Sequence, residues 1–231
     1  MEIIEQALAR GQRALTEYEA KKLLSAYDIP VTRERLAGDR KSAAAAAADI
    51  GYPVVLKGSA ADLMHKSEAG AVFVNLDGEE ALLKAYGQIK ERMGEAFDGV
   101  LVQEMVAGKR ELVVGLHREP QFGPCVMLGI GGVLTEIIND TSFRIAPFDA
   151  VEAMDMAGEL RAEKIFRAFR GEAPVDMPSL CHCLTAVGRI GEQLPAVSEI
   201  DINPLIITPR GALKAADALI VIKEAEHDTS T

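Results

Sequence analysis

The chain has 231 residues, with 25 Lys and Arg against 35 Asp and Glu, which gives a formal net charge of −10. Its 48% of apolar residues excludes wholesale disorder, and its length allows one large domain or two small ones with proper cores. The acidic charge excludes a protein that binds nucleic acid by bulk electrostatics, so any phosphate ligand must be held by local basic groups, backbone N–H groups and a metal.

The sequence also indicates a compartment. No stretch is long and apolar enough to span a bilayer, and the first residues lack the basic region and apolar run of a signal peptide. The three cysteines, Cys125, Cys181 and Cys183, are an odd count that does not suggest a disulfide framework. No second Cys or His pair completes a metal site with Cys181-His182-Cys183. We expect a cytoplasmic protein without membrane or nucleic-acid partners.

The first hundred residues predict a mixed α/β unit. Thr16 and Glu19 have the spacing of a capping box, and Gly51 follows an Ala-rich helical run. The expected elements are a helix over 16–27, an extended segment over 29–32, a helix over 41–50, strands over 54–57 and 71–76, and a helix over 79–93.

A second unit follows. Two apolar runs read as paired strands across the Arg118-Glu119-Pro120 turn. The expected elements are strands over 100–103, 112–115 and 125–128, a glycine-rich turn over 129–132, helices over 151–170 and 179–193, and strands over 197–202, 205–208 and 212–221. The mixture of elements favours an α/β (α+β) fold rather than regular βαβ repeats.

Two basic side chains lie at or just after the strand expected over 54–57. Lys57 comes at its end, where an ammonium can neutralise phosphate charge, although a lysine that merely reaches out to solvent is the ordinary alternative. His65 lies in the polar loop over 58–70, where it could act as a base, a hydrogen-bond donor or a phosphoryl acceptor, or be a plain solvated histidine.

Acidic residues mark two further places. Glu104 and Glu111 lie on either side of the point where a strand leaves its sheet. The free backbone groups there could bind the edge of an adenine. The alternative is a plain strand between domains. Strand alternation puts Glu199, Asp201 and Asn203 on one face, which suits Mg²⁺, and antiparallel pairing could bring Asp217 opposite. A solvated strand face is the alternative.

In their order along the chain, these pieces resemble one family. The most specific are Gly51 to Lys57, Leu63 to Ser67 with Gly70, Gly129 to Gly132, Ser142 to Pro147, and Glu199 to Leu205. The chain resembles the β subunit of ADP-forming acetyl-CoA synthetase, an acyl-CoA synthetase related to succinyl-CoA synthetase. The resemblance implies the ATP-grasp fold. It also implies two lobes, over 1–99 and 100–223, with a tail over 224–231 and a hinge near Gln103.

The resemblance also implies roles. Lys57 would contact the phosphates of ATP or ADP, a hinge of Glu104, Met105, Val106 and Ala107 would hold adenine, and Glu111 would bind ribose or stabilise the hinge. Asn203 and Asp217 would hold Mg²⁺, with Asp201 as a helper. His65 would be phosphorylated on a swinging loop, between a histidine of a CoA-binding α subunit and ADP. Ala71 stands where many family members have a glycine, which puts the reach of this loop in question.

Two other functions compete with this one. A different ATP-grasp ligase would activate a carboxylate directly and would not need His65. A regulatory nucleotide-binding module would also survive without that histidine.

Overall fold

The computed structural model describes residues 2–59, 71–132 and 140–223, which form two compact units. The larger unit comprises Met1–Val31 and Ala107–Thr231, and the smaller unit comprises Thr32–Val106. No helix in the described part of the chain is both long and apolar enough to cross a membrane.

The smaller unit is a four-stranded antiparallel sheet with helices over one face. The strands lie in the order β1-β4-β2-β3. Its elements are β1 (Glu34–Ala37), α3 (Arg40–Ile50), β2 (Val54–Ser59), β3 (Val72–Leu76), α4 (Glu79–Met93), η1 (Gly94–Ala96) and β4 (Gly99–Glu104). Leu82 and Ile89 of α4 are fully buried with Leu56 of β2, so the apolar face set by the 3.6-residue periodicity of α4 packs against the sheet.

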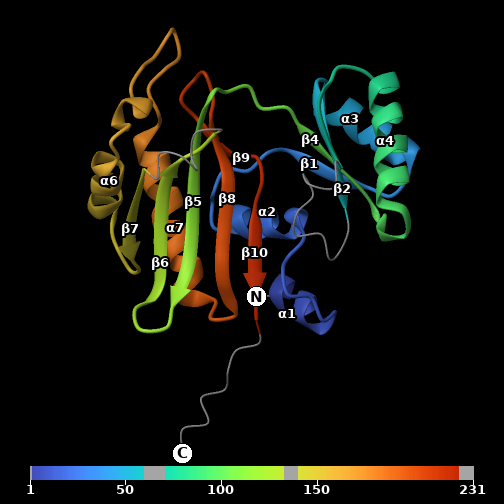
Figure 1. Cartoon of the computed structure of the whole chain (residues 1–231). Coiled ribbons are helices and arrows are strands. Elements are labelled where there is room, and N and C mark those ends of the chain that lie inside the picture. The colour runs from blue at the N-terminus through green and yellow to red at the C-terminus, as the bar shows by residue number, and fades with distance from the viewer. Residues whose placement is uncertain (1, 60–70, 133–139, 224–231) are drawn as a thin grey trace, which may run out of the picture. The chain divides into compact units, whose positions relative to one another are not determined.

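The larger unit is a six-stranded antiparallel sheet. Five strands run in the order β10-β8-β5-β6-β7, and β9 pairs with β8. Its elements are α1 (Glu2–Ala9), α2 (Glu17–Ala26), β5 (Arg110–Glu119), β6 (Gly123–Ile130), β7 (Thr141–Ile145), α6 (Ala150–Glu159), η2 (Glu163–Phe166), α7 (Met177–Gln193), β8 (Val197–Ile207), β9 (Leu213–Ala215) and β10 (Leu219–Ile222). Helices α2 and α7 lie behind this sheet in Figure 1.

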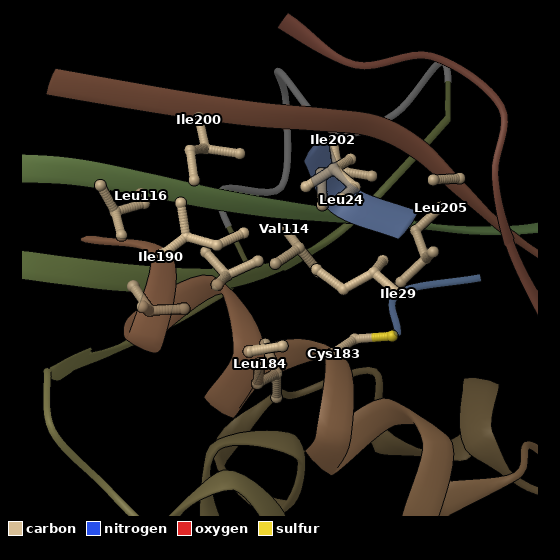
Figure 2. Close-up of a cluster of buried hydrophobic side chains, with 14 of the residues drawn as sticks. Leu24, Ile29, Val114, Leu116, Cys183, Leu184, Ile190, Ile200, Ile202 and Leu205 are labelled. Carbon is tan, nitrogen blue, oxygen red and sulfur yellow. The ribbon is translucent and has the colours of Figure 1, made fainter. Parts of the chain in front are cut away.

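The core of the larger unit lies between this sheet and its helices. Val114 and Leu116 of β5 and Ile200 of β8 meet Leu184 and Ile190 of α7, and all five are at most 2% exposed. Figure 2 shows these side chains pointing toward one another, with Cys183 among them. The burial of Cys181 and Cys183 agrees with their expected place as helix residues.

Several local signals in the sequence are confirmed. Thr16 and Glu19 form the capping box at the start of α2. Gly51 ends α3 at a φ of +92°, where glycine avoids the steric cost that a side chain would bring. Helix α4 has the expected bounds, and β5 pairs antiparallel with β6 as expected, although Arg118 and Glu119 belong to β5 and the turn lies over 120–122.

The expected division into lobes differs from the compact units in two places. Strand β4 pairs with β1 and β2, so residues 100–106 group with the smaller unit rather than with the lobe expected over 100–223. The first 31 residues group with the larger unit, because Leu15 donates a backbone hydrogen bond to Ile220 and Ala215 donates one to Pro30. The chain therefore crosses between units at 31–32 and 106–107, not at 99–100.

Four expected elements are also corrected. The helix expected over 151–170 ends at Glu159, because the backbone N–H groups of residues 161 and 162 turn to donate to the Asp140 carboxylate at 2.9 Å each. The strands expected over 197–202 and 205–208 are the single strand β8. The strand expected over 212–221 is split into β9 and β10, and Asp217 lies between them.

Candidate functional site

Lys57 lies inside a strand rather than at its end. Strand β2 continues to Ser59, and Lys57 pairs with Leu101 and Val72 on either side. The residue is only 5% exposed, so the alternative of a lysine that reaches out to solvent does not fit. A buried ammonium is costly unless it meets compensating charge or hydrogen-bond acceptors, and Lys57 does make such an interaction within the protein.

The first half of the expected hinge is already hydrogen-bonded within the smaller unit. The Glu104 carboxylate accepts hydrogen bonds from the backbone N–H of Arg33 at 2.8 Å and from its Nε at 3.1 Å. The N–H of Met105 donates to the carbonyl oxygen of Pro53 at 3.3 Å. These bonds make Glu104 an anchor of the hinge as well as a candidate ligand group.

The second half of the hinge keeps open donors. Within the described residues, the backbone N–H groups of Val106 and Ala107 have no hydrogen-bond partner. The units divide between these same two residues. An adenine edge needs a backbone donor beside an acceptor, and this pair of residues offers the donors.

Glu111, the second residue of β5, is held by the glycine-rich turn. The N–H of Gly131 donates to the carbonyl oxygen of Glu111 at 2.7 Å, and a Cβ at Gly131 would lie 2.9 Å from the Glu111 carbonyl carbon and Cβ. Only glycine permits this approach. The half-buried Glu111 carboxylate has no hydrogen bond or ion pair in the described part of the chain, so it is available to a ligand.

The expected metal ligands come together in the larger unit. Asp201 and Asn203 lie on the face of β8 opposite the buried Ile200 and Ile202, as strand alternation predicts. Ala215 pairs with Leu205 and Leu219 pairs with Asp201. This register brings Asp217, midway between the two pairs, to the level of Asn203. The expectation that antiparallel pairing brings Asp217 opposite is therefore confirmed, although Asp217 is not itself in a strand.

The electrostatics of this face favour a cation. Burial, followed by the charges of Glu199 and Asp217, raises the pKa of Asp201 above its usual range. Asp201 has no hydrogen bond or ion pair among the described residues, while the Asp217 carboxylate accepts one from the N–H of Ala218 at 2.8 Å. Two carboxylates and one amide oxygen fit the oxygen-rich set that Mg²⁺ takes, with water and phosphate as further ligands.

Metal-binding clusters and cavities elsewhere in the described part of the chain do not add to this site. No group of three or more His, Cys, Asp and Glu side chains arranged to hold a metal occurs in residues 2–59, 71–132 and 140–223. A cavity of about 320 Å³ along α7 and a groove of about 800 Å³ beside α6 contain none of the candidate residues.

His65 lies outside the described residues, as does the rest of its loop over 60–70. Its role stays a prediction. Two of the other histidines have plain surroundings: His117 is an exposed residue of β5, and the Nε2 atom of His182 lies 3.2 Å from the carbonyl oxygen of Tyr27.

The structure also adds residues that sequence reasoning missed. Arg110, next to Glu111, is a buried hub that hydrogen-bonds a distant segment over 165–173. Glu159 accepts hydrogen bonds from Ser142 and Arg144, and these bonds, those of Arg144 first, lower the pKa of its carboxyl to about 2. The one sign of this role in the sequence is a charged residue, Arg110, beside apolar β-strand residues. Its partners could not be predicted, because they are more than fifty positions away.

Comparisons with known proteins agree with this geometry. A family model described as an ATP-grasp domain matches residues 6–222. The β subunit of ADP-forming acetate–CoA ligase I from Pyrococcus furiosus is 38% identical over 226 residues, which are 96% of this chain and 97% of that subunit. ADP-forming acetate–CoA ligase I from Archaeoglobus fulgidus is 42% identical over 214 residues, which are 91% of this chain but only 31% of that longer protein.

Solved structures extend the similarity to three dimensions. Acetyl-coenzyme A synthetase 1 from Ca. Korarchaeum cryptofilum, in complex with coenzyme A and Ca-AMPCP, is 42% identical, with a TM-score of 0.91 over 96% of this chain and 99% of that one. Another structure of the same protein holds Mg-AMPPCP, with its phosphohistidine segment pointing towards the nucleotide binding site. The matched family model and the nearly full-length relatives show that this chain belongs to the ATP-grasp family of β subunits of ADP-forming acetate–CoA ligases.

Proposed function

We propose that the chain is the nucleotide-binding β subunit of an ADP-forming acyl-CoA synthetase. In this reaction, acyl-CoA, ADP and phosphate give free acid, CoA and ATP. The observation that carries the proposal is the end-to-end match with separate β subunits, combined with the open hinge donors, the free carboxylate of Glu111 and the oxygen-rich face of β8.

Each candidate residue then has a defined task. The N–H groups of Val106 and Ala107 bind adenine, and the Glu111 carboxylate accepts a hydrogen bond from a ribose hydroxyl. Lys57 neutralises phosphate charge. Asn203 and Asp217, helped by Asp201, would hold Mg²⁺, which when bound neutralises the phosphate oxygens and orients them for in-line transfer.

His65 carries the phosphoryl group in this proposal. A neutral imidazole is a competent nucleophile near pH 7, and its nitrogen–phosphorus bond breaks when a terminal oxygen of ADP takes the phosphoryl group, which leaves free histidine and ATP. The phosphoryl group comes from a separate CoA-binding α subunit, which also holds the acid. The expected cytoplasmic location rests on the sequence alone and stays a prediction.

Phosphate labelling tests this function. The chain is incubated with Mg²⁺ and ATP labelled at the γ-phosphate, and acid-labile phosphate is located by mass spectrometry. We expect label on His65, loss of that label in His65→Ala, and full label in the matched control His117→Ala. Both variants should still bind ADP in calorimetry.

The alternatives give different results. Label that persists in His65→Ala contradicts the phosphohistidine role. A different ATP-grasp ligase would form acyl phosphate with no labelled histidine, and a regulatory module would bind nucleotide without any label. Robust acyl-CoA synthetase activity of the isolated chain would contradict the need for an α subunit.

A further inference from the structure

The hinge over residues 104–107 is fixed on both sides of its open donors. Before them, the N–H of Met105 donates to the carbonyl oxygen of Pro53 at 3.3 Å. After them, a Cβ at Gly108 would lie 2.5 Å from the carbonyl oxygen of Ile207, so only glycine lets the chain pass this close to β8. The two open N–H groups therefore lie on a short span whose ends are held.

Three hydrogen bonds join the first hinge residue, Glu104, to Arg33. The N–H of Glu104 donates to the carbonyl oxygen of Arg33 at 2.9 Å. In return, the Glu104 carboxylate accepts from the N–H of Arg33 at 2.8 Å and from its guanidinium Nε at 3.1 Å. We call these three bonds the Arg33 latch. The Glu104 side chain is only 16% exposed, so its bond to the charged guanidinium is stronger than one between fully solvated groups.

Arg33 itself has little room to move. It comes just before β1, which pairs with β4, and Figure 1 shows these two strands side by side. Two residues earlier, Val31 forms a β-bridge with Ala215, and the N–H of Ala215 donates to the carbonyl oxygen of Pro30 at 2.8 Å. The backbone is thus hydrogen-bonded on either side of Arg33, and the latch fixes Glu104 in turn.

The direction of the hinge donors matters because adenine and guanine present opposite groups to them. On the edge that a backbone donor reads, N1 of adenine is an acceptor, whereas N1 of guanine carries a hydrogen. An N–H that donates to adenine N1 therefore meets a second donor when guanine takes the same place. A site built to hydrogen-bond one ligand rejects an analogue that leaves its buried polar groups unpaired. A hinge that can shift loses part of this discrimination.

We propose that Arg33 is a positioning residue that makes the hinge select adenine over guanine nucleotides. The inference rests on the proposed function, since it assumes that the hinge binds the base. Arg33 acts through Glu104 and does not itself touch the nucleotide. The carboxylate of Glu104 serves as the anchor, and the N–H groups of Val106 and Ala107 read the base.

Nucleotide binding by the full chain tests this role. Arg33→Met removes the guanidinium and keeps the apolar stem and both backbone hydrogen bonds of the latch. Calorimetry with ADP and with GDP, each in the presence of Mg²⁺, gives the ratio of the two affinities. We expect ADP affinity to fall about fivefold, which corresponds to about 1 kcal/mol, the upper end for an exposed ion pair. GDP affinity should stay at the parental level, so the preference for ADP falls by the same factor.

Arg35→Met serves as the matched control. Arg35 lies two positions further along the chain, and its side chain is 63% exposed, like that of Arg33. It pairs with the Asp49 carboxylate at 3.5 Å rather than with the hinge. Both variants remove one positive charge from neighbouring positions, so a general loss of phosphate attraction affects them alike. We expect Arg35→Met to keep the parental preference for ADP.

Two further measurements separate positioning from a merely structural role. Glu104→Gln weakens the same latch, so its combination with Arg33→Met should lower ADP affinity by less than the product of the two single effects. Arg33→Met should also unfold within about 3 °C of the parent, since an exposed ion pair contributes little to stability. A merely structural role would lower the unfolding temperature and leave the ratio of ADP to GDP affinity unchanged.

The outcomes separate the Arg33 latch from the function itself. The latch is overturned, and the proposed function left standing, by an unchanged ADP preference in Arg33→Met or by an equal fall in Arg35→Met. Single effects that multiply fully in the double variant, or a parent chain that binds ADP and GDP equally, lead to the same conclusion. A parent chain that binds neither nucleotide contradicts the proposed function as well.

Discussion

The buried hub at Arg110 offers a quantitative test of how the larger unit holds its outer segments. Arg110 is 6% exposed, and its guanidinium makes four hydrogen bonds. Three reach the carbonyl oxygens of Ile165, Arg167 and Ala173 at 2.7–3.0 Å, and one reaches the Glu172 carboxylate. Only the planar five-donor fork of arginine can serve all of these acceptors at once.

Arg110→Met keeps the apolar stem and removes the fork. The Glu172 side chain is 20% exposed and can regain some water. The carbonyl groups of Ile165, Arg167 and Ala173 lose a charged donor. Charged hydrogen bonds contribute about 1.5–3 kcal/mol each, and removal of one partner of a buried pair costs about 3–5 kcal/mol. Allowing for rehydration of Glu172, we expect a loss of about 3 kcal/mol in the free energy of unfolding of the larger unit. Arg110→Lys should recover little of it.

Urea unfolding followed by far-UV circular dichroism measures this loss, and hydrogen exchange shows where it acts. The backbone N–H groups of Phe169 and Glu172 should lose protection before the strands do. Arg167→Met is the matched control. Within the residues that the structure describes, its guanidinium binds only the nearby Glu163, and its side chain is 68% exposed, so we expect a change of about 0.5 kcal/mol or less. An Arg110→Met variant within about 1 kcal/mol of the parent, with Phe169 and Glu172 still protected, would refute this reasoning.

Three further variants test other parts of the larger unit. Asp201→Asn should stabilise the metal-free chain at pH 7 in thermal unfolding, because the raised pKa means that ionised Asp201 opposes folding, and it should lower Mg²⁺ affinity about tenfold in calorimetry. Glu159 has its pKa lowered to about 2, chiefly by Arg144, so its contribution to stability is complete above about pH 4.5 and is lost as pH falls toward 2. Glu159→Gln should therefore reduce the loss of folding stability that occurs as pH falls from about 4.5 to about 2. Gly131→Ala should cost about 1–3 kcal/mol by overpacking against Glu111 and should weaken ADP binding, whereas an unchanged ADP affinity would mean that the turn does not position that carboxylate.

The elements that the sequence predicts well are those with local causes. The capping box of Thr16 and Glu19, the stop at Gly51 and the periodicity of α4 all act within a few residues. The long helix expected over 151–170 fails for the opposite reason. Its pattern is locally helical, but the Asp140 carboxylate binds the two N–H groups just beyond Glu159 from about twenty positions away. Periodicity cannot register such a partner.

The candidate site divides in the same way. Alternation along β8 predicts that Asp201 and Asn203 share a face, because strand geometry alone decides it. The contacts of Glu104 with Arg33 and of Glu111 with Gly131 join residues far apart in the chain, so the pattern of residue types gives no sign of them. The sequence therefore indicates which residues are candidates to bind nucleotide or metal. Tertiary contacts decide which of their polar groups are already hydrogen-bonded within the protein.

The acidic face of β8 also reconciles the net charge of −10 with phosphate chemistry. Asp201 is partly buried beside Glu199 and Asp217, and their repulsion raises its pKa, so the ionised metal-free face works against folding. A cation bound there removes that repulsion and adds positive charge where phosphates must approach. If Mg²⁺ binds at this face as proposed, the same acids that lower the stability of the free chain would supply its affinity for the metal. This is why Asp201→Asn should shift stability and metal binding in opposite directions, a pattern that a merely solvated strand face would not produce.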